Sequence, residues 1–393
     1  MRKVVITGIG IASPVGIGKQ DFFENTLSGK IGITECTLFS TKKLRTNYFG
    51  TVAEVTDYFP ETPEGTSRTE ALAKLAADEL LQEMKDSQEL LQDERTCFCF
   101  GTLLGHTLHG LAWANGENPD MLAHSYDFIP HIRNLFGIRG GSYVSSAACS
   151  SGTTAAGMAF ELIRSGVYDR AVIGGVDPLS EVSAYGFHSL KNLSPEICNP
   201  FDAERDGINI GEGSAFLFAE TLESAKARNA VIYGELAGYG LNNDAYHITA
   251  PDPEGTGAYL AMKNALQDGG ILPEQVQYIN AHGTGTTHNE LMETTAIHRV
   301  FADTDELYLS SLKGQIGHCM GTSGILELAA LLLALQKQVY LPQPSLKQKM
   351  PEAGTVQIRQ QTQPLQIEYA LSNSFAFAGN TASILVRNYA DEP

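Results

Sequence analysis

Short runs of β-branched and aromatic residues alternate along this chain with longer, alanine-rich stretches of helical period. The runs KVVITG, RTCFCFG, RAVIGG, VQYINAHG and LYLSSLKG are typical of buried strands, and TEALAKLAADELLQEM and GTTAAGMAFELIRSG are typical of helices. This alternation predicts an α/β protein in which helices cover the strands of a sheet.

The chain has 393 residues, which is long for one hydrophobic core, since domains commonly have about 100–200 residues. A polar segment at 220–231 precedes a new strand-like run, so we expect two halves, 1–229 and 230–393. CSSGTTAAGMAFEL from Cys149 and CMGTSGILELAALLL from Cys319 each place a cysteine and small residues at the start of an apolar helix. This similarity between the two halves of the chain suggests a duplicated fold.

Charge and composition narrow the classes of function. The net charge of −18 argues against nonspecific binding to nucleic acid or anionic membranes, which requires a cationic surface. The six cysteines lack the spacing of a secreted disulfide framework, and the opening MRKVVITGIGIASPVG is typical of a first strand rather than a signal peptide. The most apolar stretch, 324–335, is too short to span a bilayer and contains Glu327. We expect a cytoplasmic protein with no membrane or nucleic-acid partner.

Cys149 follows a predicted strand, SYVSSAA, and opens a predicted helix. Unpaired backbone N–H groups and the helix dipole favour a thiolate at such a position. Free cysteines are also common in protein cores. The local sequence therefore leaves two readings open, a packed core residue and a nucleophile.

Two histidines follow other predicted strands, where α/β folds expose side chains. His282 lies in NAHGTGT, and His318 lies in LKGQIGHCMGTSG. Lys313, five residues before His318, either orients a neighbour or is a solvated loop lysine. Together with Cys149, the two histidines favour a nucleophilic site.

Other interpretations of these residues fit less well. TGIGIASPVG lacks the third glycine of a dinucleotide fingerprint and has Pro14 where the helix should begin. Cys149, His282 and His318 lack the paired spacing of a zinc site, so no metal is expected. A Cys-His hydrolase uses one histidine and an orienting Asn or Asp, so it leaves the second histidine and Lys313 unexplained.

Six motifs follow one another in order: VVITGIGIASPVG, AACSSGT, NPFDAERDGINIGEG (199–213), AHGTGTTHNELME (281–293), LKGQIGHCMGTSGILE (312–327) and NSFAFAGN (373–380). Nearly end to end, the chain resembles the elongating β-ketoacyl-acyl-carrier-protein synthases, condensing enzymes of the thiolase superfamily. The resemblance implies an α/β, thiolase-like duplicated fold of five αβαβα layers, normally dimeric.

The resemblance also implies a reaction. Cys149 would accept an acyl chain from the phosphopantetheine of an acyl carrier protein. Malonyl carrier protein would then lose CO₂ and attack the Cys149 thioester in a Claisen condensation, giving a chain two carbons longer in fatty acid biosynthesis. Because phosphopantetheine arrives on the carrier, no permanently bound cofactor is expected.

The resemblance assigns roles to further residues. His282 and His318 would donate hydrogen bonds to the thioester oxygen, and Lys313, held by Glu327, would fix the histidine arrangement. The remaining expectations are an oxyanion hole from the backbone N–H groups of Cys149 and Phe377, with Phe377 also in a gating loop; support from Glu293 and Asn380; and an acyl tunnel lined by Leu103 and Leu104.

The C-terminal loop departs from the pattern of this family. Ala376, Phe377, Ala378 and Gly379 replace a Gly-Phe-Gly-Gly sequence, and alanines stiffen such a loop if it requires φ > 0. Asn209 stands where an apolar residue is usual, Glu290 replaces a common aspartate, and the segment between Gly105 and Pro130 is short.

The resemblance also implies a docking surface for the carrier protein. Because carrier proteins are usually acidic, we expect a basic patch on this chain, with Arg68, Lys74 and Arg205 as candidates.

These departures keep alternatives open. One is the ketosynthase of a type II polyketide or aryl polyene cluster, paired with a chain-length partner as a heterodimer instead of a homodimer. Another is a noncatalytic chain-length factor, against which the intact set of Cys149, His282, His318 and Lys313 argues. A degradative thiolase would replace one histidine by a second cysteine, and Cys319 lies beside His318.

Overall fold

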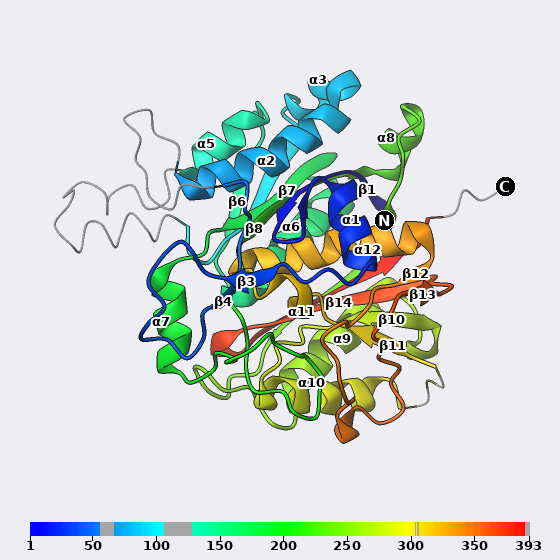
Figure 1. Cartoon of the computed structure of the whole chain (residues 1–393). Coiled ribbons are helices and arrows are strands. Elements are labelled where there is room, and N and C mark those ends of the chain that lie inside the picture. Colours follow the sequence, from blue (N-terminus) through cyan, green and yellow to red (C-terminus); the bar gives the residue numbers. More distant parts are fainter. Residues whose placement is uncertain (56–66, 106–127, 303, 305, 390–393) are drawn as a thin grey trace.

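Two half-sheets, one from each half of the chain, flank a central pair of helices (Figure 1). The computed structural model describes residues 1–55, 67–105, 128–302, 304 and 306–389. The first half-sheet contains β1 (Val4–Ser13), β5 (Thr96–Gly101), β6 (Ser142–Ser145), β7 (Arg170–Asp177) and β8 (Gly213–Thr221). The second contains β9 (Gly234–Asn243), β10 (Val276–Asn280), β11 (Tyr308–Ser310), β14 (Tyr369–Phe375) and β15 (Asn380–Arg387).

The strand orders of the two half-sheets correspond. The first half has the order β1-β8-β7-β5-β6, and the second has β9-β15-β14-β10-β11. In each, the first two pairings are antiparallel and the last two are parallel. A short antiparallel pairing of β1 with β9 joins them edge to edge. This matched topology confirms the predicted duplication.

Helices complete five layers. The helices are α1 (Lys19–Leu27), α2 (Arg68–Glu83), α3 (Gln88–Leu91), α5 (Phe128–Leu135), α6 (Ser151–Arg164), α7 (Glu181–Ser189), α8 (Leu222–Ala227), α9 (Thr256–Gly269), α10 (Thr287–Val300), α11 (Lys313–Ile316) and α12 (Ser323–Lys337). α2 and α5 cover the outer face of the first half-sheet, and α9 and α10 cover that of the second. α6 and α12 fill the layer between them. The predicted five-layer α/β architecture is confirmed.

The remaining strands are short. They are β2 (Gly16–Ile17), which pairs with β1; β3 (Ile33–Glu35), which pairs with β4 (Tyr48–Gly50); and β12 (Val339–Tyr340), which pairs with β13 (Gln363–Pro364). The proposed division of the chain between residues 229 and 230 falls between α8 and β9 and stays a prediction.

The residue pattern explains why α12 occupies the middle layer. Thirteen of its residues, from Ser323 to Leu335, are buried, as expected for a helix with sheets on both sides. α6 approaches α12 closely at their N-terminal ends. A Cβ on Gly152 would lie 2.8 Å from the carbonyl oxygen of Gly321, and one on Gly324 would lie 2.1 Å from Oγ1 of Thr153. Glycine at these two positions permits the contact.

Each central helix begins with the same turn. A 3-10 turn precedes each one, Ala148–Ser150 before α6 and Met320–Thr322 before α12, and the first residue of each turn has a φ of 50°. In this alignment Cys149 corresponds to Gly321, so Cys149 and Cys319 are not equivalent. When the two halves of the sequence are compared, the two cysteines align. In the structure, the feature that repeats between the halves is instead the backbone of the turn.

Candidate active site

Cys149 lies in the 3-10 turn immediately before α6. The left-handed backbone of Ala148 places it there, a conformation that costs an L-residue about 1 kcal/mol. The Ser151 hydroxyl accepts a hydrogen bond from the N–H of Ala147 (2.9 Å) and donates one to the carbonyl of Ala148 (2.6 Å). Cys149 is 5% exposed and lines a cavity of about 270 Å³. Reagents therefore reach the thiol through this cavity.

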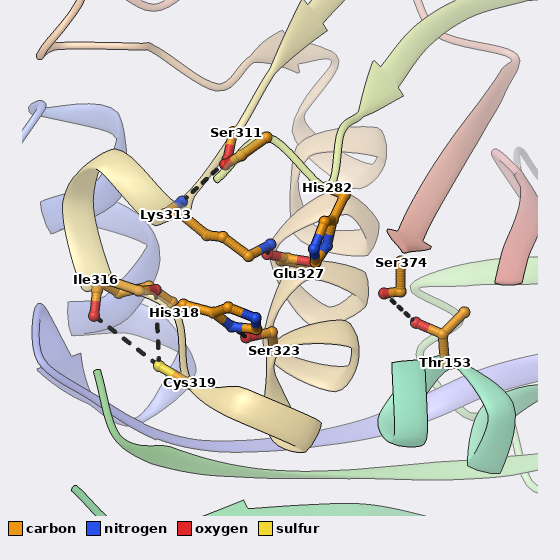
Figure 2. Close-up of polar contacts among 12 residues, drawn as sticks. Thr153, His282, Ser311, Lys313, Ile316, His318, Cys319, Ser323, Glu327 and Ser374 are labelled. Atoms are coloured by element: carbon orange, nitrogen blue, oxygen red, sulfur yellow. Dashed lines mark hydrogen bonds and ion pairs between the residues drawn. The ribbon is translucent and has the colours of Figure 1, made fainter. Parts of the chain in front are cut away.

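Two histidines from the second half of the chain line the same cavity. His282 follows β10, and its backbone N–H donates to Oε1 of Glu293 at 2.9 Å. His318 lies between α11 and α12, and its Nδ1 is 2.8 Å from the hydroxyl of Ser323 (Figure 2). The two ring centroids are 5.5 Å apart, with the ring planes at 84°. The site thus combines a thiol from one half with two imidazoles from the other.

A buried ion pair lies beside the two rings. Nζ of Lys313 donates to Oε1 of Glu327, and neither side chain is exposed (Figure 2). Burial and the Lys313 charge both lower the pKa of His282 and the pKa of His318. Both imidazoles are therefore neutral at neutral pH.

The hydrogen-bonding pattern fixes which nitrogen of His318 is free. Within the described residues, Nε2 of His318 has no hydrogen-bond partner. In the tautomer with the proton on Nε2, Nδ1 accepts from the Ser323 hydroxyl and Nε2 is free to donate to a ligand. His318 in this tautomer is a hydrogen-bond donor.

Burial raises the pKa of the Cys149 thiol to about 11, although Lys313 and the backbone of Phe377 lower it. The sequence predicts a stabilised thiolate at this helix start. The structure has the stabilising groups, but desolvation outweighs them. Cys149 is therefore a neutral thiol in this state.

Phe377 lies over the site in the loop between β14 and β15. Its ring stacks on Phe187 of α7, with centroids 5.5 Å apart, and the Phe187 ring also contacts His318 edge-on at 6.5 Å. Ala378 has a φ of 61°. The loop therefore takes a positive φ at Ala378 and also at Gly379 (75°), and the alanine adopts this conformation at a conformational cost.

Asn380 supports this loop from its outer side. Nδ2 of Asn243 donates to Oδ1 of Asn380 at 3.1 Å and to the carbonyl of Ala378 at 2.7 Å. The carbonyl of Asn380 accepts the N–H of Ala376 at 2.8 Å. Asn380 therefore fixes the loop backbone and has no hydrogen bond to a histidine or to Cys149 among the described residues.

The described part of the chain shows neither a metal-binding group nor a membrane-spanning helix. It contains no group of three or more His, Cys, Asp or Glu side chains placed to hold a metal ion. None of its helices has both the length and the apolar character needed to cross a membrane.

Comparison with known proteins identifies the family. Residues 1–225 match the family model described as beta-ketoacyl synthase, N-terminal domain, and residues 233–347 match that of the C-terminal domain. The chain belongs to the β-ketoacyl synthase family. It is an enzyme of the condensing acyltransferase class.

Relatives of this synthase are similar over their whole length. The 3-oxoacyl-[acyl-carrier-protein] synthase 2 of Synechocystis sp. is 34% identical over 99% of this chain and 98% of the relative. The enzyme of the same name from Staphylococcus aureus (strain COL) is 32% identical over 99% of both chains.

Solved structures of synthases share the fold. One is a chain from AntDE:AntF, a type II polyketide synthase acyl-carrier protein in complex with its ketosynthase; it has a TM-score of 0.91 and 29% identity, and the match covers 99% of this chain and 100% of that one. Another comes from the ketosynthase ApeO with its chain length factor ApeC from Xenorhabdus doucetiae, with a TM-score of 0.83 and 29% identity over 99% and 98% of the two chains.

The predicted acyl-pocket residues of the synthase are separate from the cavity lining. Leu103 and Leu104 are not among its lining residues. They pack against an apolar cluster that includes Ile208 and Met320, and Ile208 does line the cavity. Their contact with an acyl chain stays a prediction. His106 and His109 follow GTLLG in the sequence and are expected from it to line a pocket; they lie outside the described residues.

Two of the three candidate docking cations are wrong. Arg68 is fully buried and pairs with the buried Glu212, and the Arg205 side chain is 7% exposed beside Glu290. Lys74 is exposed and pairs with Asp78. A positive charge in the sequence does not reveal whether a buried carboxylate from a distant segment binds it.

Sequence reasoning missed three residues of the site. Ser323 orients His318, Phe187 stacks on Phe377, and the buried Asp177 hydrogen-bonds two loops close to the cavity. Asp177 binds donors that lie 73 or more residues away in the sequence, so no local pattern marks it. Ser323 lies five residues after His318, but its hydroxyl is one of several small polar groups in that motif. Phe187 follows a glycine in α7, which also contains Val182 and Tyr185, so an aromatic residue there does not by itself indicate a site.

Proposed function

We propose that this enzyme transfers an acyl chain to Cys149 and then condenses it with a malonyl unit carried by an acyl carrier protein, giving a β-ketoacyl carrier two carbons longer. The observation that carries the proposal is that Cys149, His282 and His318 line one cavity. A nucleophile and two neutral imidazoles are the groups that this reaction needs. The curated relatives named 3-oxoacyl-[acyl-carrier-protein] synthase 2 favour fatty acid synthesis.

In the first step, the sulfur of Cys149 attacks the thioester carbonyl of the acyl carrier. A carbon–sulfur bond forms to Cys149, the bond to the carrier sulfur breaks, and the proton of Cys149 passes to the departing thiolate. The backbone N–H groups of Cys149 and Phe377, both of which lower the pKa of the thiol, donate to the developing oxyanion. One such donor is commonly worth about 3 kcal/mol of barrier.

In the second step, the malonyl thioester loses CO₂. The electron pair of the broken carbon–carbon bond moves into the thioester as an enolate, whose oxygen accepts hydrogen bonds from His318 and His282. The enolate carbon then attacks the acyl carbonyl on Cys149. The bond to Cys149 breaks, and the released thiolate takes a proton from water. Neutral imidazoles suit this role because they donate without being consumed as acids.

Lys313 acts through the rings in this proposal. Burial is the main cause of the low pKa of both imidazoles, and the Lys313 charge lowers it further; Glu327 holds Lys313 in place. Glu293 fixes the backbone of His282 through two hydrogen bonds, one from His282 and one from the next residue, each at 2.9 Å. These residues position the donors and do not attack the substrate.

A second candidate is the ketosynthase of a type II polyketide or aryl polyene cluster. The solved complexes with an acyl-carrier protein and with a chain length factor, together with Ala376 and Ala378 in the loop, favour it. In both candidates the carrier delivers phosphopantetheine to the cavity, and the assembly is a homodimer or a heterodimer with a chain-length partner. Dimerisation and activity of the chain purified alone support the first candidate. Activity only after co-expression with a chain-length partner supports the second.

Product analysis tests the proposal. The enzyme is mixed with acyl carriers of graded length and malonyl carrier, and the carrier products are identified by mass. We expect a β-ketoacyl carrier two carbons longer, which His318→Ala abolishes and which His131→Ala, a change of an exposed histidine, leaves unaffected. Absence of this product with every acyl carrier, with and without a partner subunit, contradicts the proposal.

A further inference from the structure

Asp177 is a fully buried carboxylate at the end of β7. No ion pair found among the described residues includes it. Burying an ionised carboxylate without a cation is costly unless hydrogen bonds replace its water. Five donors fill that role, and they come from two separate segments of the chain.

One carboxylate oxygen binds the loop that follows β5. Oδ1 of Asp177 accepts from the N–H of Leu103 at 3.0 Å and from the N–H of Leu104 at 2.6 Å. It also accepts from the hydroxyl of Thr102 at 2.9 Å, which shares its proton with the carbonyl of Val176 at 3.0 Å. The side chains of these two leucines pack against the apolar cluster that reaches the cavity through Ile208. The position of this loop therefore bears on the shape of the wall behind Ile208.

The other oxygen binds the turn that precedes α12. Oδ2 accepts from the N–H of Thr322 at 3.0 Å and from its hydroxyl at 3.1 Å. The next residue, Ser323, holds Nδ1 of His318. A shift of Thr322 would thus move the hydroxyl that orients His318.

The loop and the turn also touch directly. A Cβ placed on Gly321 would lie 2.8 Å from the backbone nitrogen of Leu103 and 3.0 Å from Oδ2 of Asp177. Met320, in the same turn, belongs to the apolar cluster that Leu103 and Leu104 pack against. Because these two segments are in close contact, a displacement of the loop after β5 also displaces the turn before α12.

We propose that Asp177 is a positioning residue that couples the loop Thr102–Gly105 to the turn that orients His318, so that one carboxylate affects both acyl-chain selection and decarboxylation. This inference rests on the proposed function, since it assumes that the wall behind Ile208 bounds the acyl chain and that His318 assists loss of CO₂. The inference adds to that function a physical connection between acyl-chain selection and decarboxylation.

Three substitutions separate the two sides of the carboxylate. Thr102→Val removes a donor on the loop side, Thr322→Val removes one on the His318 side, and Asp177→Asn replaces one acceptor oxygen by an NH₂ group that faces existing donors. Three quantities are measured for each: the rate of Cys149 acylation for a series of chain lengths, the rate of malonyl carrier decarboxylation, and the free energy of unfolding. Asp78→Asn, on the surface of α2, is the matched control.

The coupling predicts a split between these quantities. Thr102→Val should change the order of preferred chain lengths and leave decarboxylation within about twofold of the native rate, whereas Thr322→Val should lower decarboxylation by about tenfold and leave the order of chain lengths unchanged. Asp177→Asn should do both. A merely structural role would instead lower every rate in parallel with the loss of stability, and that result overturns the inference.

The double variant Thr102→Val/Thr322→Val keeps the inference testable if Asp177→Asn does not fold. Coupling through Asp177 predicts that the two changes are non-additive, by about threefold or more in decarboxylation, and additive effects overturn it. Failure of this inference is distinct from failure of the proposed function. If the native enzyme forms the β-ketoacyl product but the variants show no split, only the coupling is wrong. If the native enzyme forms no product, the proposed function is wrong.

Discussion

The hydroxyl of Ser323 lies 2.8 Å from Nδ1 of His318 (Figure 2). Ser323→Ala removes this bond and leaves the buried Nδ1 without a partner among the described residues, so the ring loses the contact that orients it. We expect decarboxylation of malonyl carrier to fall by about tenfold, with acylation of Cys149 changed by less than about twofold. The rate of CO₂ release measures decarboxylation, and the mass of the intact protein at timed intervals measures acylation of Cys149.

Ser165→Ala is the control, because Ser165 is an exposed serine whose hydroxyl donates to backbone carbonyls of α6. It should leave both steps unchanged. Equal losses of acylation and decarboxylation in Ser323→Ala would contradict a specific role in orienting His318.

The loop around Phe377 offers a matched pair of glycine substitutions. Ala378 has a φ of 61° and Ala376 has a φ of −124°. Ala378→Gly relieves a left-handed alanine and should raise the free energy of unfolding by about 0.5–1 kcal/mol. Ala376→Gly only adds freedom to the unfolded chain, so it should lower that free energy by about 0.5–1 kcal/mol. Urea titrations of both variants measure the signs, and a loss of stability in Ala378→Gly would show that the left-handed backbone is not strained.

The buried Glu290 predicts a pH dependence of stability. Burial raises its pKa to about 8 from 4.5, against an N–H donor from Gly285 and the charge of Arg205. The folded protein therefore holds a proton that the unfolded chain releases. The stabilisation from this group is complete below pH 4.5 and is lost as the pH rises to about 8.

Glu290→Gln removes this titration. At about pH 6 to 7 the unfolded chain has lost the Glu290 proton and the folded protein still holds it, so Glu290→Gln should raise the slope of unfolding free energy against pH by about 1.4 kcal/mol per pH unit. The histidines titrate equally in the native protein and in the variant, so their contribution cancels. Urea unfolding at several pH values measures the slope. Glu223→Gln, at an exposed carboxylate, should match the native slope, and an unchanged slope in Glu290→Gln would show that Glu290 is ionised in the folded protein.

The buried pair of Lys313 and Glu327 predicts non-additive stability changes. Lys313→Met leaves the Glu327 carboxyl without its cation and should cost about 3–5 kcal/mol of stability. Adding Glu327→Leu should recover most of this loss, because an apolar pair replaces an unpaired charge. Chemical denaturation of the two single variants and the double variant completes the cycle. Additive losses would contradict direct pairing.

The sequence predicted the parts of this molecule that local patterns encode. Cys149, His282 and His318 follow the predicted strands β6, β10 and β11 in the sequence, and this pattern singled them out as the residues that line one cavity. It could not show that Arg68 is buried, since its partner Glu212 lies 144 residues away. Asp177 was missed for the same reason, because its five donors come from two remote segments. The sequence also suggested that Cys149 and Cys319 are equivalent positions in the two halves. This was wrong, because the two halves share the backbone conformation of the turn and not the position of the cysteine within it.

Intact-protein mass spectrometry tests the central claim most directly. The native enzyme is incubated with an acyl carrier in the absence of malonyl carrier, beside Cys149→Ala and a Cys36→Ala control at the half-buried Cys36. The account predicts a single added acyl group on the native enzyme and on Cys36→Ala, and none on Cys149→Ala. An acyl group that persists on Cys149→Ala, or that never forms on the native enzyme with any acyl carrier, would contradict it.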